Sequence, residues 1–153
     1  MAADNKTQAA TRPKYTANRS PIDRQREMST FFDEFVEVFR TFDGNLIAIH
    51  YAAPYLAIHA DGSTGLFIEH KEIGPYFQRV VDSYQQRGCR SCRYKNLKVV
   101  ALGEQCCLST VTWELLTEKG AVLSAWRESY TMLRSADGLH ILTSVDHSGS
   151  LSK

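Results

Sequence analysis

A short alternating segment, WRESYTM at 126–132, carries side chains that could bind a small molecule or move a proton. Successive side chains of a β-strand point to opposite faces of its sheet, so every second residue of this segment lies on one face. A carboxyl group and a phenol hydroxyl on the same face can hold, donate and accept protons. The segment predicts a strand with four residues directed into a pocket: Trp126, Glu128, Tyr130 and Met132.

A histidine near the end of an earlier apolar run is a second candidate for proton transfer. His59 lies in YLAIHAD, residues 55–61. Imidazole has an ordinary pKa of about 6.5, which makes it a usable base near pH 7. His59 is therefore a candidate catalytic residue, together with Tyr130 and Glu128. The alternative is a histidine that is hydrogen-bonded inside a packed core and has no chemical role.

Helical periodicity comes before the alternating segments. The sequence from Thr30 to Asp33 predicts a helix start, because the threonine oxygen can accept a hydrogen bond from a free amide of the first turn. Phenylalanines then recur at helical spacing until Asp43-Gly44 ends the helix. We expect a short helix over about 45–52 and a third helix within 69–88, with the YLAIHAD strand between them.

Four alternating runs follow the third helix: 94–102, 106–116, 121–133 and 139–147. Short glycine-containing turns separate them, so consecutive runs form an antiparallel meander. The helices precede this sheet and must cover one of its faces, while the twist of the sheet leaves one end open. The expected fold class is α+β: a cone-shaped α+β barrel with three N-terminal helices packed on a curved, mostly antiparallel sheet.

Length and composition favour one domain. The chain has 153 residues, 43% of them hydrophobic, and a net charge of +1. We expect a disordered basic leader at 1–27, the domain at 28–149 and a tail at 150–153. The longest apolar stretch, 46–60, is interrupted by histidines and a proline, so no membrane partner is expected. The N-terminus lacks the apolar centre of a secretory signal, which predicts a cytoplasmic location.

The cysteines match a redox or zinc site only in part. Cys89 and Cys92 form a CxxC pair, but Cys106 and Cys107 are adjacent and would point to opposite faces of a strand. We expect reduced thiols and no metal site, with a reactive Cys89–Cys92 pair as the alternative. The sequence has no glycine-rich phosphate loop, so no cofactor is expected.

Basic residues gather in the leader and again around 87–98. The second group lacks the interleaved aromatic residues of a platform for single-stranded nucleic acid. We expect a solvated rim there and no nucleic-acid partner, with a polyanion-binding surface as the alternative.

The order of the elements, the YLAIHADG segment and the closing WRESYTMLRSADGLHILTSVDH resemble the nuclear transport factor 2-like superfamily, in particular its SnoaL-like and ketosteroid-isomerase-like branches. The similarity extends over about 28–147. It implies the cone-shaped fold with a pocket for a small molecule. The superfamily includes isomerases, cyclases, dehydratases, epoxide hydrolases and non-enzymatic modules, so the fold does not decide the function.

The resemblance also implies roles for single residues. In the isomerase branch an aspartate on the first strand is the general base, and His59 occupies its place. The branch's oxyanion tyrosine matches Phe35, which cannot donate a hydrogen bond. Its protonated aspartate matches Tyr130, or Glu128 two residues earlier, and either side chain could still donate. The resemblance therefore implies an altered site rather than ketosteroid isomerisation itself.

The same alignment turns Thr143, Val145 and His147 of the last strand inward. Further ligand contacts are expected from eight residues: Phe35, Tyr51, Tyr55, Trp113, Trp126, Met132, Thr143 and His147. The predicted function is binding of a small, largely apolar or oxygenated molecule, with proton transfer of the isomerase, cyclase or dehydratase type. The alternative is a non-catalytic ligand-binding or dimerisation module, forming a homodimer through an outer sheet face that carries Leu123, Ala125 and Leu133.

Overall fold

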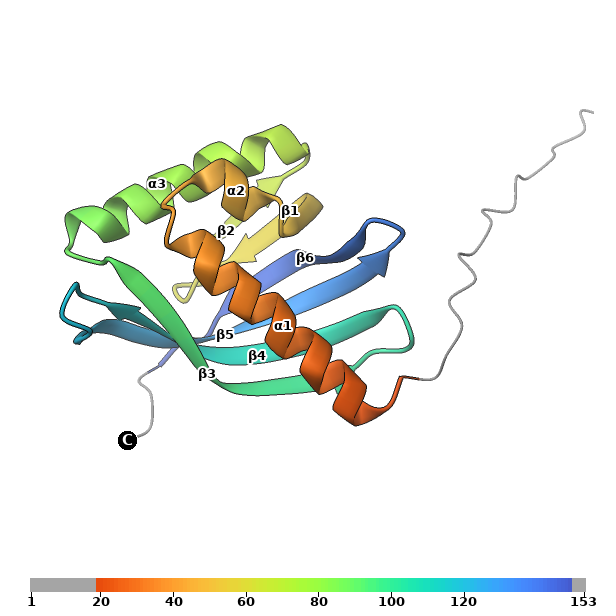
Figure 1. Cartoon of the computed structure of the whole chain (residues 1–153). Coiled ribbons are helices and arrows are strands. Elements are labelled where there is room, and N and C mark those ends of the chain that lie inside the picture. Colours follow the sequence, from red (N-terminus) through yellow and green to blue (C-terminus); the bar gives the residue numbers. More distant parts are fainter. Residues whose placement is uncertain (1–18, 150–153) are drawn as a thin grey trace, which may run out of the picture.

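The computed structural model describes residues 19–149 (Figure 1). The predicted tail and most of the predicted leader lie outside this range. The elements are α1 (Pro21–Phe39), α2 (Gly44–Ala48), β1 (Tyr51–Ile58), β2 (Thr64–Phe67), the 3₁₀ turn η1 (His70–Glu72), α3 (Ile73–Gln86), β3 (Ser91–Ala101), β4 (Cys106–Leu116), β5 (Val122–Ser135) and β6 (Gly138–Asp146). Within residues 19–149, no helix is both long enough and apolar enough to cross a membrane.

One six-stranded sheet forms the body of the fold, in the order β2-β1-β6-β5-β4-β3. All neighbouring strands are antiparallel except β1 and β6, which are parallel. The three helices lie on one side of this sheet, and α1 crosses it diagonally (Figure 1). The predicted α+β cone with a curved, mostly antiparallel sheet is confirmed. Strand β2 was not predicted, because its four residues directly follow the turn at Asp61–Gly62.

Helix α1 begins much earlier than Thr30, so the predicted helix start is wrong. Ser20 is the N-cap, and its Oγ accepts a hydrogen bond from the backbone amide of Asp23 at 3.1 Å. Pro21 occupies the first helical position, where its missing N–H costs nothing. Thr30 lies inside the helix and its hydroxyl donates to the carbonyl of Arg26. Residues 21–27, predicted as leader, are therefore part of the folded domain.

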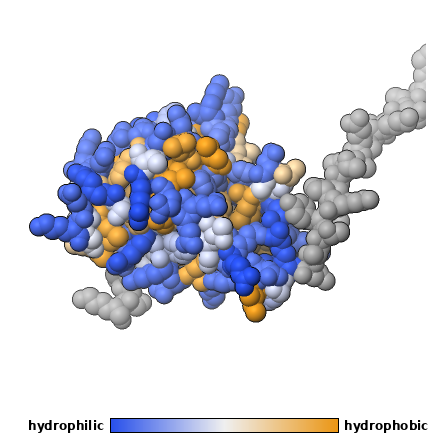
Figure 2. All heavy atoms as spheres, viewed as in Figure 1, coloured by the Kyte–Doolittle hydropathy of each residue, from blue (hydrophilic) through white to orange (hydrophobic). Residues whose placement is uncertain are grey.

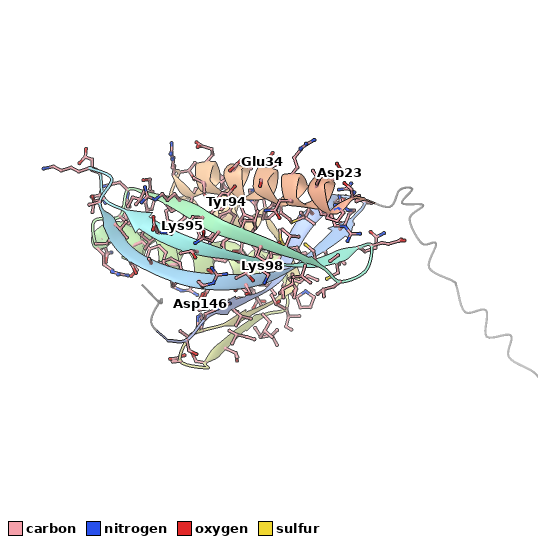
Figure 3. The ribbon with its side chains drawn as sticks, turned by 90° about the horizontal axis from the view of Figure 1, so that it is seen from below. Asp23, Glu34, Tyr94, Lys95, Lys98 and Asp146 are labelled. Carbon is pink, nitrogen blue, oxygen red and sulfur yellow. The ribbon has the colours of Figure 1, made fainter. Side chains whose placement is uncertain are left out.

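Phenylalanines of α1 form the centre of the core. Phe32 is 0% exposed and its ring lies 5.6 Å from that of Tyr130 and 6.0 Å from that of Trp113. Full burial of such a side chain contributes about 2–3 kcal/mol. Tyr94 of β3 points toward α1 and donates to Asp33 at 2.7 Å. Figure 3 shows Tyr94 on the α1 side of the sheet. Its hydrogen bond to Asp33 holds α1 against β3.

Helix α2 is shorter than predicted: it ends at Ala48, and the strand already begins at Tyr51. The pairing of β1 with β6 is irregular between Tyr51 and Leu56, which accommodates Pro54 inside the strand. Figure 2 shows a largely hydrophilic surface on this side of the molecule, with a hydrophobic patch in the region of α2. Leu46 and Ile49 of that region are 40% and 59% exposed.

Helix α3 is held against α2 by a close backbone approach. A Cβ at Gly44 would lie only 2.4 Å from the carbonyl oxygen of Gly74, so glycine is required there. The amide of Gly44 also donates to Oε1 of Gln78 at 2.8 Å. This contact fixes α3 over the open side of the sheet, where it forms one wall of the site described below.

A β-bulge in β6 changes which residues face inward. Met132 pairs with Ile141, whereas Thr131 pairs with Thr143, so Leu142 is an extra residue. An extra residue shifts the alternation by one and turns every following side chain to the other face. The prediction that residues 143, 145 and 147 point inward is therefore wrong. The inward residues after the bulge are Ser144 and Asp146.

Candidate functional site

A cavity of about 430 Å³ lies between the concave face of the sheet and the helices α1 and α3. This volume lies in the range typical of sites for small molecules, and most of the lining is aromatic or aliphatic. Eight of the predicted site residues line it: Phe35, Tyr51, Tyr55, His59, Trp113, Trp126, Glu128 and Tyr130.

Three predicted ligand-binding residues lie elsewhere. Met132 points inward as predicted, but it is fully buried in the core beyond the cavity, beside Met28 and Cys107. Thr143 and His147 face outward because of the bulge at Leu142. On the outer face, the Thr143 hydroxyl pairs with that of Thr131, and Nε2 of His147 lies 2.7 Å from Oγ of Ser129.

Hydrogen-bond donors converge on the carboxyl group of Glu128. Nε1 of Trp126 donates to Oε2 of Glu128 at 3.0 Å. The Tyr130 hydroxyl accepts from Nε1 of Trp113 at 2.6 Å, and its interaction with Glu128 lowers the pKa of that acid. Because Tyr130 and Trp113 are 2% and 4% exposed, this chain of donors is rigid.

The second acid of the site is Asp146, which the bulge turns toward Glu128. Burial raises the pKa of Glu128 to about 8, and the negative charge of Asp146 contributes to the rise. Burial also raises the pKa of Asp146, while the nearby His59 opposes this rise. The interaction between the two carboxyl groups raises the pKa of Glu128 and lowers that of Asp146. The two acids titrate as a coupled pair, and burial favours the neutral form of Glu128.

His59 connects this pair to solvent. Its Nδ1 lies 3.9 Å from Oδ2 of Asp146, and the two side chains are 37% and 34% exposed. The groups thus run from the buried Tyr130 through Glu128 and Asp146 to His59 near the surface. A protonated acid inside an apolar cavity, next to a base that reaches water, is the arrangement that general acid–base catalysis requires.

Tyrosines form much of the remaining wall. The Tyr51 ring lies 4.5 Å from Phe77, which in turn lies 4.9 Å from Tyr76. The hydroxyl of Tyr55 is 2.5 Å from Oγ of Ser144. Burial raises the pKa of Tyr76 to about 12, so its hydroxyl stays neutral and can donate to a ligand.

Several lining residues were not predicted as site residues. Asp146 was missed because a bulge cannot be seen in an alternating pattern, and counting through it selects the wrong face. Tyr76 and Arg79 of α3 also line the cavity. They directly precede Phe77 and Val80, which line the cavity as well.

The cysteines do not form a reactive or metal site. All four thiols are free. Cys92 lines the cavity, but burial raises its pKa to about 12, so it is a poor nucleophile at neutral pH. Across residues 19–149, no three histidine, cysteine or acidic side chains come together as a metal ion would need.

Comparison with known proteins is consistent with this geometry. Residues 26–149 match the family described as NTF2-like protein (DUF6841). A search of curated proteins gave no match. Among solved structures, Aln2 from a Streptomyces species has a TM-score of 0.68 and 16% identity, over 85% of this chain and 93% of that chain.

Two further structures have the same fold. An NTF2-like protein with a cystatin-like fold from Novosphingobium aromaticivorans has a TM-score of 0.66 and 9% identity, over 86% of this chain and 85% of that chain. A candidate dehydratase of the NTF2-like family from Streptomyces avermitilis has a TM-score of 0.63 and 10% identity, over 86% of this chain and 100% of that chain. At these identities the similarity concerns the fold. Since the family match extends over most of the sequence, the chain belongs to the NTF2-like family.

Proposed function

We propose that the protein binds a small, largely apolar or oxygenated molecule in the cone-shaped cavity and transfers a proton on it, as isomerases, cyclases and dehydratases do. One observation carries the proposal: Glu128, whose pKa burial raises to about 8, lines an aromatic cavity beside the Asp146–His59 pair that reaches solvent. Such a pair separates the acid and the base that a carbonyl compound needs for enolisation.

The proposed reaction begins with a carbonyl oxygen that replaces Asp146 as the acceptor of the Glu128 proton. His59 removes a proton from the carbon next to the carbonyl, and the C–H electron pair forms the C=C bond of an enol. The carbonyl π electrons move to the oxygen, which takes the proton of Glu128. In a ligand whose reacting carbon also carries a C=C bond, the enol is a dienol: His59 returns the proton to the far carbon of that bond, the C=C bond shifts next to the carbonyl, and the enol O–H proton returns to Glu128, which completes an isomerisation.

Two neighbours support this step without touching the reacting carbon. The carboxylate of Asp146 stabilises the imidazolium that forms on His59. The Tyr130 hydroxyl is already engaged by Trp113 and Glu128, so it acts as a positioning residue for the acid.

Proton exchange on a simple ketone tests the proposal without knowledge of the natural substrate. The probe is 2-tetralone in D₂O, with loss of the NMR signals of the protons next to the carbonyl as the readout. We expect the protein to accelerate exchange, and His59→Ala and Glu128→Gln to abolish the acceleration while unfolding temperatures stay close to wild type.

His147→Ala is the matched control, because this histidine lies on the outer face. Full activity in His59→Ala, or an equal loss in His147→Ala, would exclude the proposed mechanism.

A second candidate function is a non-catalytic dimerisation module that uses the outer sheet face. Leu66, Val100 and Leu133 are 61%, 43% and 37% exposed, and strand pairing places them on that face. Of the other residues predicted for this face, Ala125 is exposed and Leu123 packs partly against the core. Light scattering tests the idea: wild type should be a dimer and Leu133→Lys a monomer, whereas a monomeric wild type would contradict it.

The location and the partners that we propose follow from the composition of the chain. With a net charge of +1, the chain has no strong attraction to polyanions, so we propose a cytoplasmic protein with neither a nucleic-acid nor a membrane partner. The proposed reaction uses only side chains and requires no cofactor.

A further inference from the structure

We propose that Arg79 of α3 binds an anionic group at the outer end of the ligand, and that the ligand is a small ketone bearing a carboxylate. This inference rests on the proposed function, because it takes the carbonyl of the ligand to lie at Glu128. Arg79 lines the cavity, is exposed to solvent, and carries the permanent positive charge of the lining. Within residues 19–149 it forms no ion pair.

Arg79 and the acid Glu128 differ in their depth within the lining. Arg79 is exposed to solvent, whereas Glu128 is half-buried and lies two residues from the buried Tyr130 on the inner face of β5. Tyr76 and Arg79 are three residues apart on α3, so they are neighbours on one side of the helix. The positive charge of the lining therefore lies at its solvent end.

The two ends of the cavity therefore differ in charge, which favours one orientation of a charged ligand. An anionic group near Asp146 would be repelled by its carboxylate, whereas the same group near Arg79 is attracted. The planar guanidinium group also presents two parallel N–H donors to a carboxylate. A ligand with a neutral carbonyl and a distant carboxylate thus fits one orientation, with the carbonyl inward and the carboxylate at Arg79.

Three matched probes test the inference by calorimetry: 4-acetylbenzoate, methyl 4-acetylbenzoate and (4-acetylphenyl)trimethylammonium. They share one aryl ketone and carry a negative, a neutral or a positive group at the opposite end. We expect the carboxylate to bind about threefold or more tightly than the ester, because an exposed charge pair contributes modestly. The cation should bind most weakly.

Arg79→Gln should bring the carboxylate to the affinity of the ester and leave the ester unchanged. Lys98→Gln is the matched control, because it removes the same charge from β3, away from the cavity lining (Figure 3). Equal binding of all three probes, or an unchanged carboxylate preference in Arg79→Gln, would overturn the inference and leave the proposed function standing. Binding by none of the probes would count against both.

Discussion

Two glutamates on neighbouring strands show how the faces of one sheet differ. Glu114 of β4 points to the outer face, where its carboxylate meets Nε of Arg93 at 2.5 Å and Nζ of Lys95 at 2.7 Å. These partners lower its pKa, so it is ionised. Glu128 of β5 points to the inner face, where burial and a second acid raise its pKa to about 8 and favour its neutral form. The sheet thus provides an ion pair on one side and a proton donor on the other with the same residue type.

The other polar groups follow the same division. On the outer face, hydroxyl pairs such as Thr110 with Ser129, 2.7 Å apart, remain partly in contact with water. On the inner face, the hydroxyl of Tyr130 and the indole N–H of Trp113 are bonded to each other in a buried setting. A buried polar group without a partner costs about 1–3 kcal/mol of stability. Removal of either side chain of this inner pair should therefore destabilise the protein.

The largest expected difference between the faces is in packing. Met132 is 0% exposed, and Met132→Ala should lower the free energy of unfolding by about 2–5 kcal/mol because it leaves a cavity in the core. Its neighbour Thr131 points outward, and Thr131→Ala should cost only about 1 kcal/mol for the lost hydroxyl pair. Urea denaturation measures both values. Equal costs would mean that the two faces are not packed differently.

Glu128 and Glu114 should make the stability of the protein depend on pH in opposite directions. The folded-state pKa of Glu128 is about 8, above its ordinary value of about 4.3. Its stabilising contribution to the free energy of unfolding is therefore fully present below pH 4.3. That contribution is lost as the pH rises toward 8, by on the order of a few kcal/mol. Glu114 has a lowered pKa, so its contribution is present above pH 4.3 and is lost as the pH falls through its folded-state pKa.

Amide substitutions separate these two contributions. Glu128→Gln should be more stable than wild type at pH 9, because the folded protein no longer holds a buried charge, and should lose the advantage near pH 5. Glu114→Gln should be less stable than wild type at pH 7 and should converge with it in acid. Thermal unfolding from pH 3 to 9 measures both variants. The same trend in the two variants would contradict the assigned protonation states.

The smallest expected effect concerns the cations of the outer face. The Lys95 side chain is 54% exposed, so Lys95→Gln should cost less than about 1 kcal/mol. The cost should shrink further in 1 M salt, where exposed charges are screened. A cost that persists in salt would mean that this ion pair is more than a surface contact.

Most of the fold could be predicted from periodicity. The spacing of phenylalanines from Phe31 to Phe39 and the alternation in 121–133 indicate a helix and a strand, and both are present. The start of α1 could also have been found, because Ser20-Pro21 is a typical cap sequence. The pattern at Thr30 instead predicts a helix start inside the helix, because a threonine there can also bond to the preceding turn.

The site could be predicted only in part. Alternation correctly directs Trp126, Glu128 and Tyr130 inward, because β5 is regular along these residues. In β6 the extra residue Leu142 reverses the alternation, and neither composition nor spacing reveals it. The acid that completes the pair, Asp146, therefore required the register of the folded sheet.

The most direct test of the central claim is the ionisation of Glu128 itself. With ¹³C-labelled glutamate, the carboxyl resonance of Glu128 can be assigned from its loss in Glu128→Gln and followed through a pH titration. The account predicts a midpoint at about 8, well above that of every exposed glutamate. A midpoint near 4.3, the ordinary value for glutamate, would mean that the cavity holds no proton donor at neutral pH and would contradict the account.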